Sequence, residues 1–385
     1  GIHVQRKIAV RQWESYSGNR GIRYGLGTKK GVMIMKDIMK ALVYTKADGI
    51  HLTDVPTPKI EKNTDVIIRV DLSTICGTDI HIANGLLPVE DGTIIGHEFV
   101  GTIAEVGPAV KKFKVGDKVA ANCITTCGEC YYCKHGYTNH CEDGGWIFGY
   151  KINGCQAEYV RAPYADNSLF KISDDVDVEK LLFVGDILST GYFGAERGDI
   201  KPGDVVVVLG SGPVGMCAMA SARMFGPSKI IAIDTEESRL EVAKKQGIAD
   251  LTINPAKEDA IAIVQSLTEG KGADVSIECA GVKPTFDMSW QIVRPNGTVS
   301  VVALYNDAQE LPLQIMANKN LTFRTGWVDS VHMTELISLI ENGKIDLDFL
   351  ITHKAPLNDI LKGYDIFGGK KENCLKWVIT PYVED

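Results

Sequence analysis

The feature that most constrains the fold is a glycine-rich turn directly after an apolar run. The run Asp204-Val-Val-Val-Val-Leu leads into Gly210-Ser-Gly212-Pro213-Val-Gly215, and a helical pattern continues to Phe225. A strand, a glycine turn and a helix N-terminus in this order form a cradle for the pyrophosphate of a dinucleotide. We therefore predict a dinucleotide-binding unit, with Gly210, Gly212, Pro213 and Gly215 at the cofactor.

The chain after this turn alternates between strand-like and helical patterns. One helical segment covers residues 236–246, and the strand-like runs are residues 205–209, 230–233, 251–253, 275–278, 298–302 and 321–324. This rhythm favours an α/β fold with a doubly wound parallel sheet.

The acidic residue Asp234 ends the second of these runs, nineteen residues after Gly215. A carboxylate at this place binds the ribose hydroxyls of NAD and repels the 2'-phosphate of NADP. We therefore expect NAD. Arg239 keeps NADP open as the less favoured alternative, because a nearby guanidinium can accommodate that phosphate.

A second constellation lies in the β-rich first part of the chain. His97 stands beside Glu98 in a glycine-bounded stretch, residues 96–107, and Cys76 comes directly after a strand-like run. With Asp186, near the expected hinge, they offer sulfur, nitrogen and oxygen ligands for a metal. Thr78 and His81 can relay a proton, and Asp79 can orient His97 from behind.

Four cysteines crowd into a short lobe. Three thiols at a spacing of three residues, closed by a fourth, can hold a tetrahedral zinc with no open position, and these are Cys127, Cys130, Cys133 and Cys141. Such a site contributes folding energy rather than chemistry. The remaining cysteines, including Cys123 and Cys279, fall in no such pattern and are interpreted as structural.

Composition limits the remaining possibilities. The chain has 385 residues, a net charge of -8 and no apolar run near the roughly 20 residues that span a bilayer. Nucleic-acid and membrane partners are therefore not expected. Residues 1–38, basic and without periodicity, are set aside as a leader, with a mitochondrial-type targeting segment as the alternative. Clustered thiols favour a reducing, cytoplasmic setting.

From about Met39 onward, these residues resemble the zinc-dependent medium-chain alcohol dehydrogenases. The resemblance implies a GroES-like catalytic domain, residues 39–189 and 328–385, and a Rossmann NAD-binding domain, residues 190–327. It implies two zinc ions per chain, one catalytic on Cys76, His97 and Asp186 and one structural in the lobe 127–141. It also places Thr78 and His81 in a proton relay, Glu98 near the metal, and Thr190 and Val214 against the nicotinamide.

Asp186 departs from the best-known animal and plant members, which carry a second cysteine there. Aspartate is similar to the bacterial secondary-alcohol dehydrogenases and to glutathione-independent formaldehyde dehydrogenases. It is a harder ligand than a thiolate. The same bacterial likeness favours a homotetramer over a dimer.

The expected function is reversible hydride transfer between NAD and a primary or secondary alcohol, giving an aldehyde or ketone. A polyol, amino-alcohol or formaldehyde dehydrogenase of the same family is the alternative. A zinc-ribbon nucleic-acid binder and a catalytically silent NAD-binding protein are the less favoured classes. Lys376 is a candidate for the cofactor phosphates. Trp146, Tyr305 and Trp327 are candidates for the substrate pocket, although each is more readily explained as core.

Overall fold

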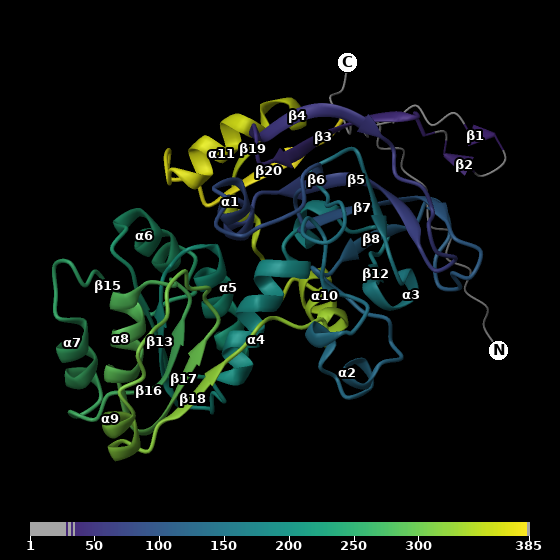
Figure 1. Ribbon diagram of the computed structural model, residues 1–385. Helices are drawn as coiled ribbons and strands as arrows, with labels where there is room; N and C mark the ends of the chain where they lie inside the picture. Colours follow the sequence, from purple (N-terminus) through teal and green to yellow (C-terminus); the bar gives the residue numbers. More distant parts are fainter. Residues whose placement is uncertain (1–27, 30–31, 34, 383–385) are drawn as a thin grey trace, which may run out of the picture.

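The parallel sheet predicted from the glycine turn is present in the computed structural model, which describes residues 28–29, 32–33 and 35–382. Its spatial order is β15-β14-β13-β16-β17-β18, and every neighbouring pair is parallel. The strands are β13 (Val205–Leu209), β14 (Lys229–Ile233), β15 (Leu251–Ile253), β16 (Ala273–Glu278), β17 (Val293–Val301) and β18 (Thr322–Thr325). This is the doubly wound order of dinucleotide-binding domains, and it confirms the predicted fold class (Figure 1).

Short helices connect and flank these strands. They are α5 (Pro213–Ala222), α6 (Glu237–Lys245), α7 (Ala260–Leu267), α8 (Lys283–Gln291) and α9 (Leu313–Asn318). Pro213 opens α5, where its missing N–H costs no hydrogen bond. At Gly215 an added Cβ would lie 1.8 Å from the carbonyl oxygen of Gly210, so the close approach of α5 to the turn requires glycine.

The other domain is built from antiparallel strands around β5 (Val66–Thr74). A mixed sheet has the order β12-β8-β7-β5-β20-β19, with β11 also paired to β5, and a smaller sheet has the order β4-β3-β6. Its strands are β3 (Ile38–Thr45), β4 (Gly49–Pro56), β6 (Thr93–Ile94), β7 (Phe99–Val106), β8 (Lys118–Ala121), β11 (Tyr159–Ala162) and β12 (Leu169–Lys171). Eight of the nine residues of β5 are buried, as expected for a strand covered on both faces.

Shorter elements of this domain carry the two cysteine motifs. The helices are α1 (Gly77–Ala83), α2 (Tyr131–Lys134) and α3 (Ala165–Ser168), and a small ladder joins β9 (Ile124–Thr125) to β10 (Gly145–Trp146). Cys76 comes just before α1, and the four clustered cysteines lie around α2.

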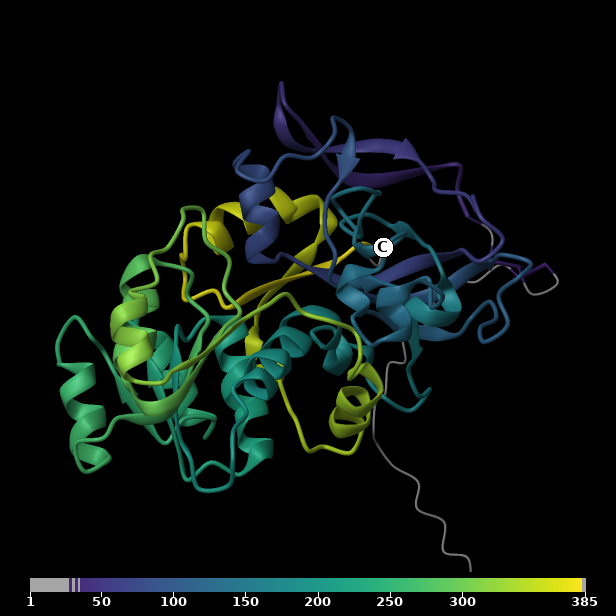
Figure 2. The ribbon, with the colours of Figure 1, turned by 60° about the horizontal axis from the view of Figure 1, so that its bottom comes forward.

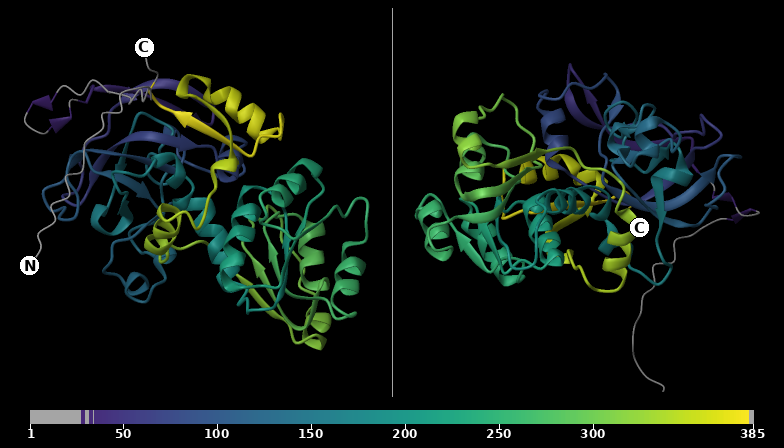
Figure 3. Two further views of the ribbon diagram at one scale, coloured as in Figure 1. Left: turned by 180° about the vertical axis from the view of Figure 1, so that it is seen from behind. Right: turned by 90° about the horizontal axis from the view of Figure 1, so that it is seen from below.

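The C-terminal segment returns to the first domain, as predicted. It contains α10 (Met333–Glu341), β19 (Ile351–Pro356), α11 (Ile360–Gly368) and β20 (Lys376–Thr380). Strand β20 pairs antiparallel with β5 through Val378 opposite Thr74. In Figures 2 and 3 its yellow end, which contains β19, α11 and β20, lies against the purple and blue strands rather than against the green sheet.

Two crossings join the domains. The first is a π-helical turn, Val184–Leu188, that continues directly into α4 (Ser189–Arg197), the helix between the two sheets in Figure 1. Its Gly185 packs so closely that an added Cβ would lie 1.9 Å from the carbonyl oxygen of Ala121. The second crossing is the irregular segment between β18 and α10.

The predicted leader, residues 1–38, lies mostly outside the described residues. Within the described part, β1 (Thr28–Lys29) pairs with β2 (Val32–Met33). Thr57 bonds the carbonyl oxygens of Lys36 and Asp37, at 2.6 and 2.9 Å, and β3 begins at Ile38. The predicted boundary at residue 39 is therefore wrong for residues 36–38, which belong to the β-rich domain.

None of the helices in the described part of the chain has the length and apolar character needed to cross a membrane.

Candidate active site and metal centres

Helix α1 positions the first group of site residues. Its preceding residue, Cys76, donates its backbone N–H to Asp79 Oδ2 at 2.9 Å, so the carboxylate caps the helix and fixes the cysteine. Thr78 and His81 are three residues apart on this helix and therefore face the same side. The hydroxyl of Thr78 lies 4.0 Å from Cys76 Sγ, next to the predicted metal ligand.

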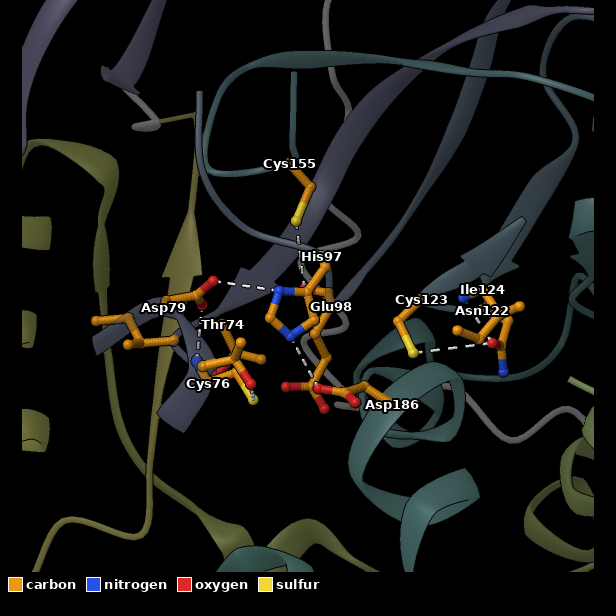
Figure 4. A network of polar contacts seen from close by, with 12 residues as sticks. Thr74, Cys76, Asp79, His97, Glu98, Asn122, Cys123, Ile124, Cys155 and Asp186 are labelled. Atoms are coloured by element: carbon orange, nitrogen blue, oxygen red, sulfur yellow. Dashed lines mark hydrogen bonds and ion pairs between the residues drawn. The ribbon is translucent and has the colours of Figure 1, made fainter. Parts of the chain in front are cut away.

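His97 is aimed by a glycine and two carboxylates. Gly96 has φ of +100°, and an added Cβ there would lie 2.6 Å from the Gln156 side chain. His97 Nδ1 lies 3.2 Å from Asp79 Oδ1, and its Nε2 lies 3.2 Å from Asp186 Oδ2 (Figure 4). The ring therefore presents Nε2 to the centre of the group, while Asp79 stands behind it, as predicted.

The three predicted ligands meet at one point. One ligand atom each from Cys76, His97 and Asp186 lie within 4.8 Å of one another. Asp186 Oδ2 is buried and has no hydrogen-bond partner. Burial by itself raises the pKa of Asp186, but His97 and Lys376 more than offset it, so the pKa is lowered and the carboxylate is ionised. A buried, ionised carboxylate whose one close polar contact on Oδ2 is His97 Nε2, with a thiol nearby, suits zinc, which takes sulfur, nitrogen and oxygen ligands at about 2.0–2.3 Å.

The lobe cysteines form a second group, whose ligand atoms lie as close together as those of the first. One sulfur each from Cys127, Cys130, Cys133 and Cys141 lies within 4.8 Å of the others. Backbone N–H groups point at these sulfurs, from Cys127 to Cys141 Sγ at 3.2 Å and from Cys130 to Cys127 Sγ at 3.4 Å. Backbone N–H donors stabilise thiolates. A group of four thiolates fits a structural zinc ion with no open coordination position.

A cavity of about 250 Å³ lies over the three-ligand group. Its lining includes the predicted relay residues Thr78 and His81 and the predicted nicotinamide contacts Thr190 and Val214. Residues from both domains therefore share one cleft with the metal ligands. The predicted proton path and the predicted cofactor contacts face the same space.

Comparison with known proteins agrees with this geometry. Residues 62–174 match the alcohol dehydrogenase GroES-like domain, and residues 213–342 match the zinc-binding dehydrogenase family. An alcohol dehydrogenase of Cupriavidus necator is 38% identical over 372 residues, which cover 90% of this chain and 100% of that protein. The chain belongs to the zinc-dependent medium-chain alcohol dehydrogenase family.

Solved structures of family members share the whole architecture. Zinc-dependent alcohol dehydrogenase 2 from Streptococcus pneumonia, in its apo form, is 39% identical with a TM-score of 0.85, covering 90% of this chain and 99% of that one. An alcohol dehydrogenase from Thermus sp. ATN1 is 35% identical with a TM-score of 0.83, covering 89% and 99%. The chain is thus a zinc-dependent alcohol dehydrogenase, an oxidoreductase that acts on CH–OH groups.

The family's glycine turn is held from the neighbouring strand. Asp234 Oδ2 accepts a hydrogen bond from the backbone N–H of Ser211 at 2.6 Å, which ties the end of β14 to the turn. Arg239 lies beside the same turn, since an added Cβ on Gly212 would be 3.5 Å from its Nη1. Both residues therefore border the predicted cofactor cradle.

The prediction that Lys376 faces the cofactor phosphates is wrong. Its side chain is 1% exposed and donates to Glu98 Oε2 at 2.6 Å and to the carbonyl oxygen of Ile75 at 2.9 Å. Burial alone lowers the pKa of Lys376, but the Glu98 carboxylate outweighs it and raises the pKa to about 12. Lys376 therefore neutralises the buried Glu98 behind the metal ligands instead of reaching the cofactor.

Several residues around the site carry no signal in the sequence. Gln156 donates to Asp79 Oδ2 at 3.0 Å and accepts from the Tyr364 hydroxyl at 2.7 Å, which extends the support of His97 to α11. Trp146 and Trp327, named from the sequence as candidates for the substrate pocket, line the cavity, as do Cys123 and Cys279, which were interpreted as structural. Tyr305 does not line it and instead donates to the Glu278 carboxylate. Only tertiary contacts reveal the roles of Gln156 and Tyr364 and the place of Cys123 and Cys279 at the cavity.

Proposed function

We propose that the chain transfers hydride reversibly between NAD and a primary or secondary alcohol, giving an aldehyde or ketone. One observation carries the proposal: Cys76, His97 and Asp186 lie on the same cavity as Thr190 and Val214. An alcohol at the metal ligands and a nicotinamide against Thr190 and Val214 would therefore be in contact. Holding two reactants in this way removes much of the entropic barrier to their reaction.

The metal ligands and their neighbours prepare the alcohol. Zinc held by these three residues would act as a Lewis acid that acidifies a hydroxyl at neutral pH. Asp79 keeps His97 Nδ1 occupied, which leaves Nε2 free to serve as a ligand. The ionised Asp186 and the Cys76 sulfur balance the charge of the ion, so a neutral alcohol can enter without a further counter-charge.

Thr78 and His81 provide the proposed route for the proton. Thr78 Oγ1 lines the cavity beside Cys76 and can accept the hydroxyl proton of the substrate. His81, which faces the same cavity from the next turn of α1, can receive it and pass it to solvent. Glu98 is given no part in this route, because it does not line the cavity and its Oε2 is bonded to Lys376.

NAD rather than NADP is proposed from the carboxylate at the end of β14. Asp234 also accepts the backbone N–H of Glu236 at 2.9 Å, so its position is fixed before any cofactor binds. A fixed negative charge disfavours the 2'-phosphate, while Arg239 beside the turn works in the opposite direction. The ratio of kcat/KM for NAD over NADP measures which residue dominates, and replacing Asp234 with Ala should lower it.

The direct test is an oxidation panel of primary, secondary and polyhydroxy alcohols with NAD and NADP, together with the zinc content. We expect NAD-dependent oxidation of simple alcohols and two zinc ions per chain. Activity confined to polyols or formaldehyde would overturn the substrate assignment. Zinc in the lobe alone, without activity, would overturn the enzymatic one.

A homotetramer and a cytoplasmic location complete the proposal. The carboxylate ligand Asp186, shared with bacterial secondary-alcohol dehydrogenases, supports the tetramer, and light scattering measures it. The two thiol-containing metal sites need reduced cysteines, which supports a reducing compartment.

A further inference from the structure

The segment that follows β18 forms part of the substrate cavity without secondary structure of its own. Gly326, Trp327 and Val328 all line the cavity, and no helix or strand begins before Met333. A wall made of irregular backbone needs an outside support to keep one shape. The support therefore has to come from neighbouring elements.

The four-cysteine lobe supplies that support through two consecutive side chains. Asn139 Nδ2 donates to the carbonyl oxygen of Trp327 at 2.7 Å. Thr138 Oγ1 accepts from the backbone N–H and from the hydroxyl of Ser330, both at 3.0 Å. These bonds join parts of the chain 188 and 192 residues apart, where the lobe around α2 meets the segment leading to α10 (Figure 1).

Trp327 is connected to the metal ligands through ring contacts. Its ring packs edge-on against Trp146 with centroids 5.9 Å apart, and Trp146 packs edge-on against His97 at 5.5 Å. Val328, which is buried, packs with Cys123 and Ile124, and both indoles pack against this cluster. The wall next to the metal ligands is therefore apolar and aromatic, which favours a bulky apolar or aromatic substituent on the substrate.

We propose that Thr138 and Asn139 are positioning residues that fix Trp327 as the wall of the substrate cavity, so that the enzyme selects alcohols with a bulky apolar or aromatic substituent. The inference rests on the proposed alcohol oxidation. It gives the four-cysteine lobe a task in substrate recognition in addition to its structural one.

Four variants test the positioning role of Thr138 and Asn139, each with a substituted side chain close in size to the original one. Thr138→Val removes only the hydroxyl, whereas Thr138→Ser keeps it. Asn139→Asp turns the amide donor into an oxygen that faces the Trp327 carbonyl. Asn167→Asp is the control, since Asn167 Nδ2 donates to the carbonyl oxygen of Cys127 at 3.0 Å, in the same lobe but away from the wall.

The kinetic test compares benzyl alcohol with ethanol. Loss of a hydrogen bond to the wall should raise the KM for benzyl alcohol about fivefold to tenfold in Thr138→Val and Asn139→Asp. The kcat and the KM for ethanol should stay near wild type, because ethanol has only a methyl group to offer to the wall and gains little from its shape. Thr138→Ser and Asn167→Asp should behave as wild type.

A spectroscopic test does not depend on catalysis. The chain has five tryptophans, so labelling with 5-fluorotryptophan gives few fluorine signals, and Trp327→Phe identifies the one of interest. That signal should shift or broaden in Thr138→Val and Asn139→Asp and stay in place in Asn167→Asp. An unmoved signal with unchanged KM values, or an equal change in Asn167→Asp, would overturn the inference. A wild type that oxidises no alcohol would overturn the proposed function alone.

Discussion

His97 shows how one side chain is fixed by partners from distant parts of the chain. Asp79 holds its Nδ1, Gln156 holds Asp79, and Tyr364 holds Gln156, all of them in the interior. Buried polar groups in such a chain are costly to leave unpaired, so each member restrains the next. The orientation of the metal-binding nitrogen is thereby set by the fold rather than by the metal.

Replacing Asp79 with Asn should lower the zinc affinity of the catalytic site and leave the zinc of the four-cysteine lobe in place. The amide cannot hold the imidazole N–H as a carboxylate does, and loss of such a partner typically lowers metal affinity about 10–100-fold. Competition with a chromogenic chelator measures the affinity. Asp71→Asn is the control, because Asp71 accepts from Thr102 at 2.6 Å instead of from a metal ligand. An equal loss in both variants would argue against a specific role for Asp79.

Asp186 should be essential for one of the two zinc ions. In Asp186→Ala the site keeps only sulfur and nitrogen ligands, and we expect the zinc content to fall from two ions toward one and activity to be lost. Asp186→Cys should keep both ions and change the turnover, because a thiolate is a softer donor. Full zinc and full activity in the Ala variant would rule out Asp186 as a ligand.

The cysteine and histidine ligands were predictable from the sequence because each lies in a short local pattern, whereas Asp186 was indicated as a ligand by the family resemblance. A cysteine at a strand end, a histidine after a glycine and four clustered thiols all show in the linear chain. Their supports were not predictable, since Gln156, Tyr364 and Lys376 contact the site only after folding. Lys376 was misassigned for this reason: its partner Glu98 lies 278 residues earlier.

At the scale of elements, the glycines of the β13–α5 turn have two different roles, one in packing and one in leaving room for the cofactor. Gly215 must lack a Cβ because the helix packs on the carbonyl of Gly210. Gly212 has φ of -74°, and an added Cβ there would meet only Arg239 Nη1, at an ordinary contact distance of 3.5 Å. Gly212 is therefore not required by the fold. Its bare backbone leaves room for the cofactor's pyrophosphate to approach.

Two alanine variants should distinguish the packing role of Gly215 from the cofactor-binding role of Gly212. Gly215→Ala should lower the free energy of unfolding by about 1–3 kcal/mol, the usual cost of overpacking. Gly212→Ala should keep wild-type stability and bind NAD more weakly. Denaturant unfolding and NADH fluorescence titration measure the two effects. Equal stability of both variants would contradict the packing argument.

The doubly wound sheet was the most predictable part of the fold, because its strands are continuous apolar runs between helices. Strand ends were less predictable: β17 begins at Val293, where it pairs with Ala273 before an irregularity in the register. The irregular segment 326–330 gave no pattern at all. Its place in the cavity wall depends on Thr138 and Asn139, far away in sequence.

For the whole molecule, the ion pair of Glu98 and Lys376 fastens the C-terminal strand to the first domain. Lys376→Met would leave a buried carboxylate without its counter-charge, and we expect a loss of about 3–5 kcal/mol in unfolding free energy. Burial raises the pKa of Glu98 above that of an unfolded glutamate. Protonation of Glu98 removes its unpaired buried charge. The loss of unfolding free energy in Lys376→Met should therefore be smaller at pH 5 than at pH 8.

Denaturant unfolding at the two pH values measures this loss. The double variant Lys376→Met with Glu98→Leu removes both charges and should recover part of the stability. A double variant as unstable as the single one at both pH values would show that packing, and not charge, explains the loss.

The continuous helical segment from Val184 through Arg197 has a consequence for turnover. It carries Asp186 and, four residues later, Thr190, the proposed nicotinamide contact, so one unbroken helical segment holds both residues. A rotation of the domains about this segment would change the width of the entrance and leave the distance between Asp186 and Thr190 nearly constant. Domain motion should therefore govern how fast substrates are admitted and products are released, and hydride transfer should be insensitive to it.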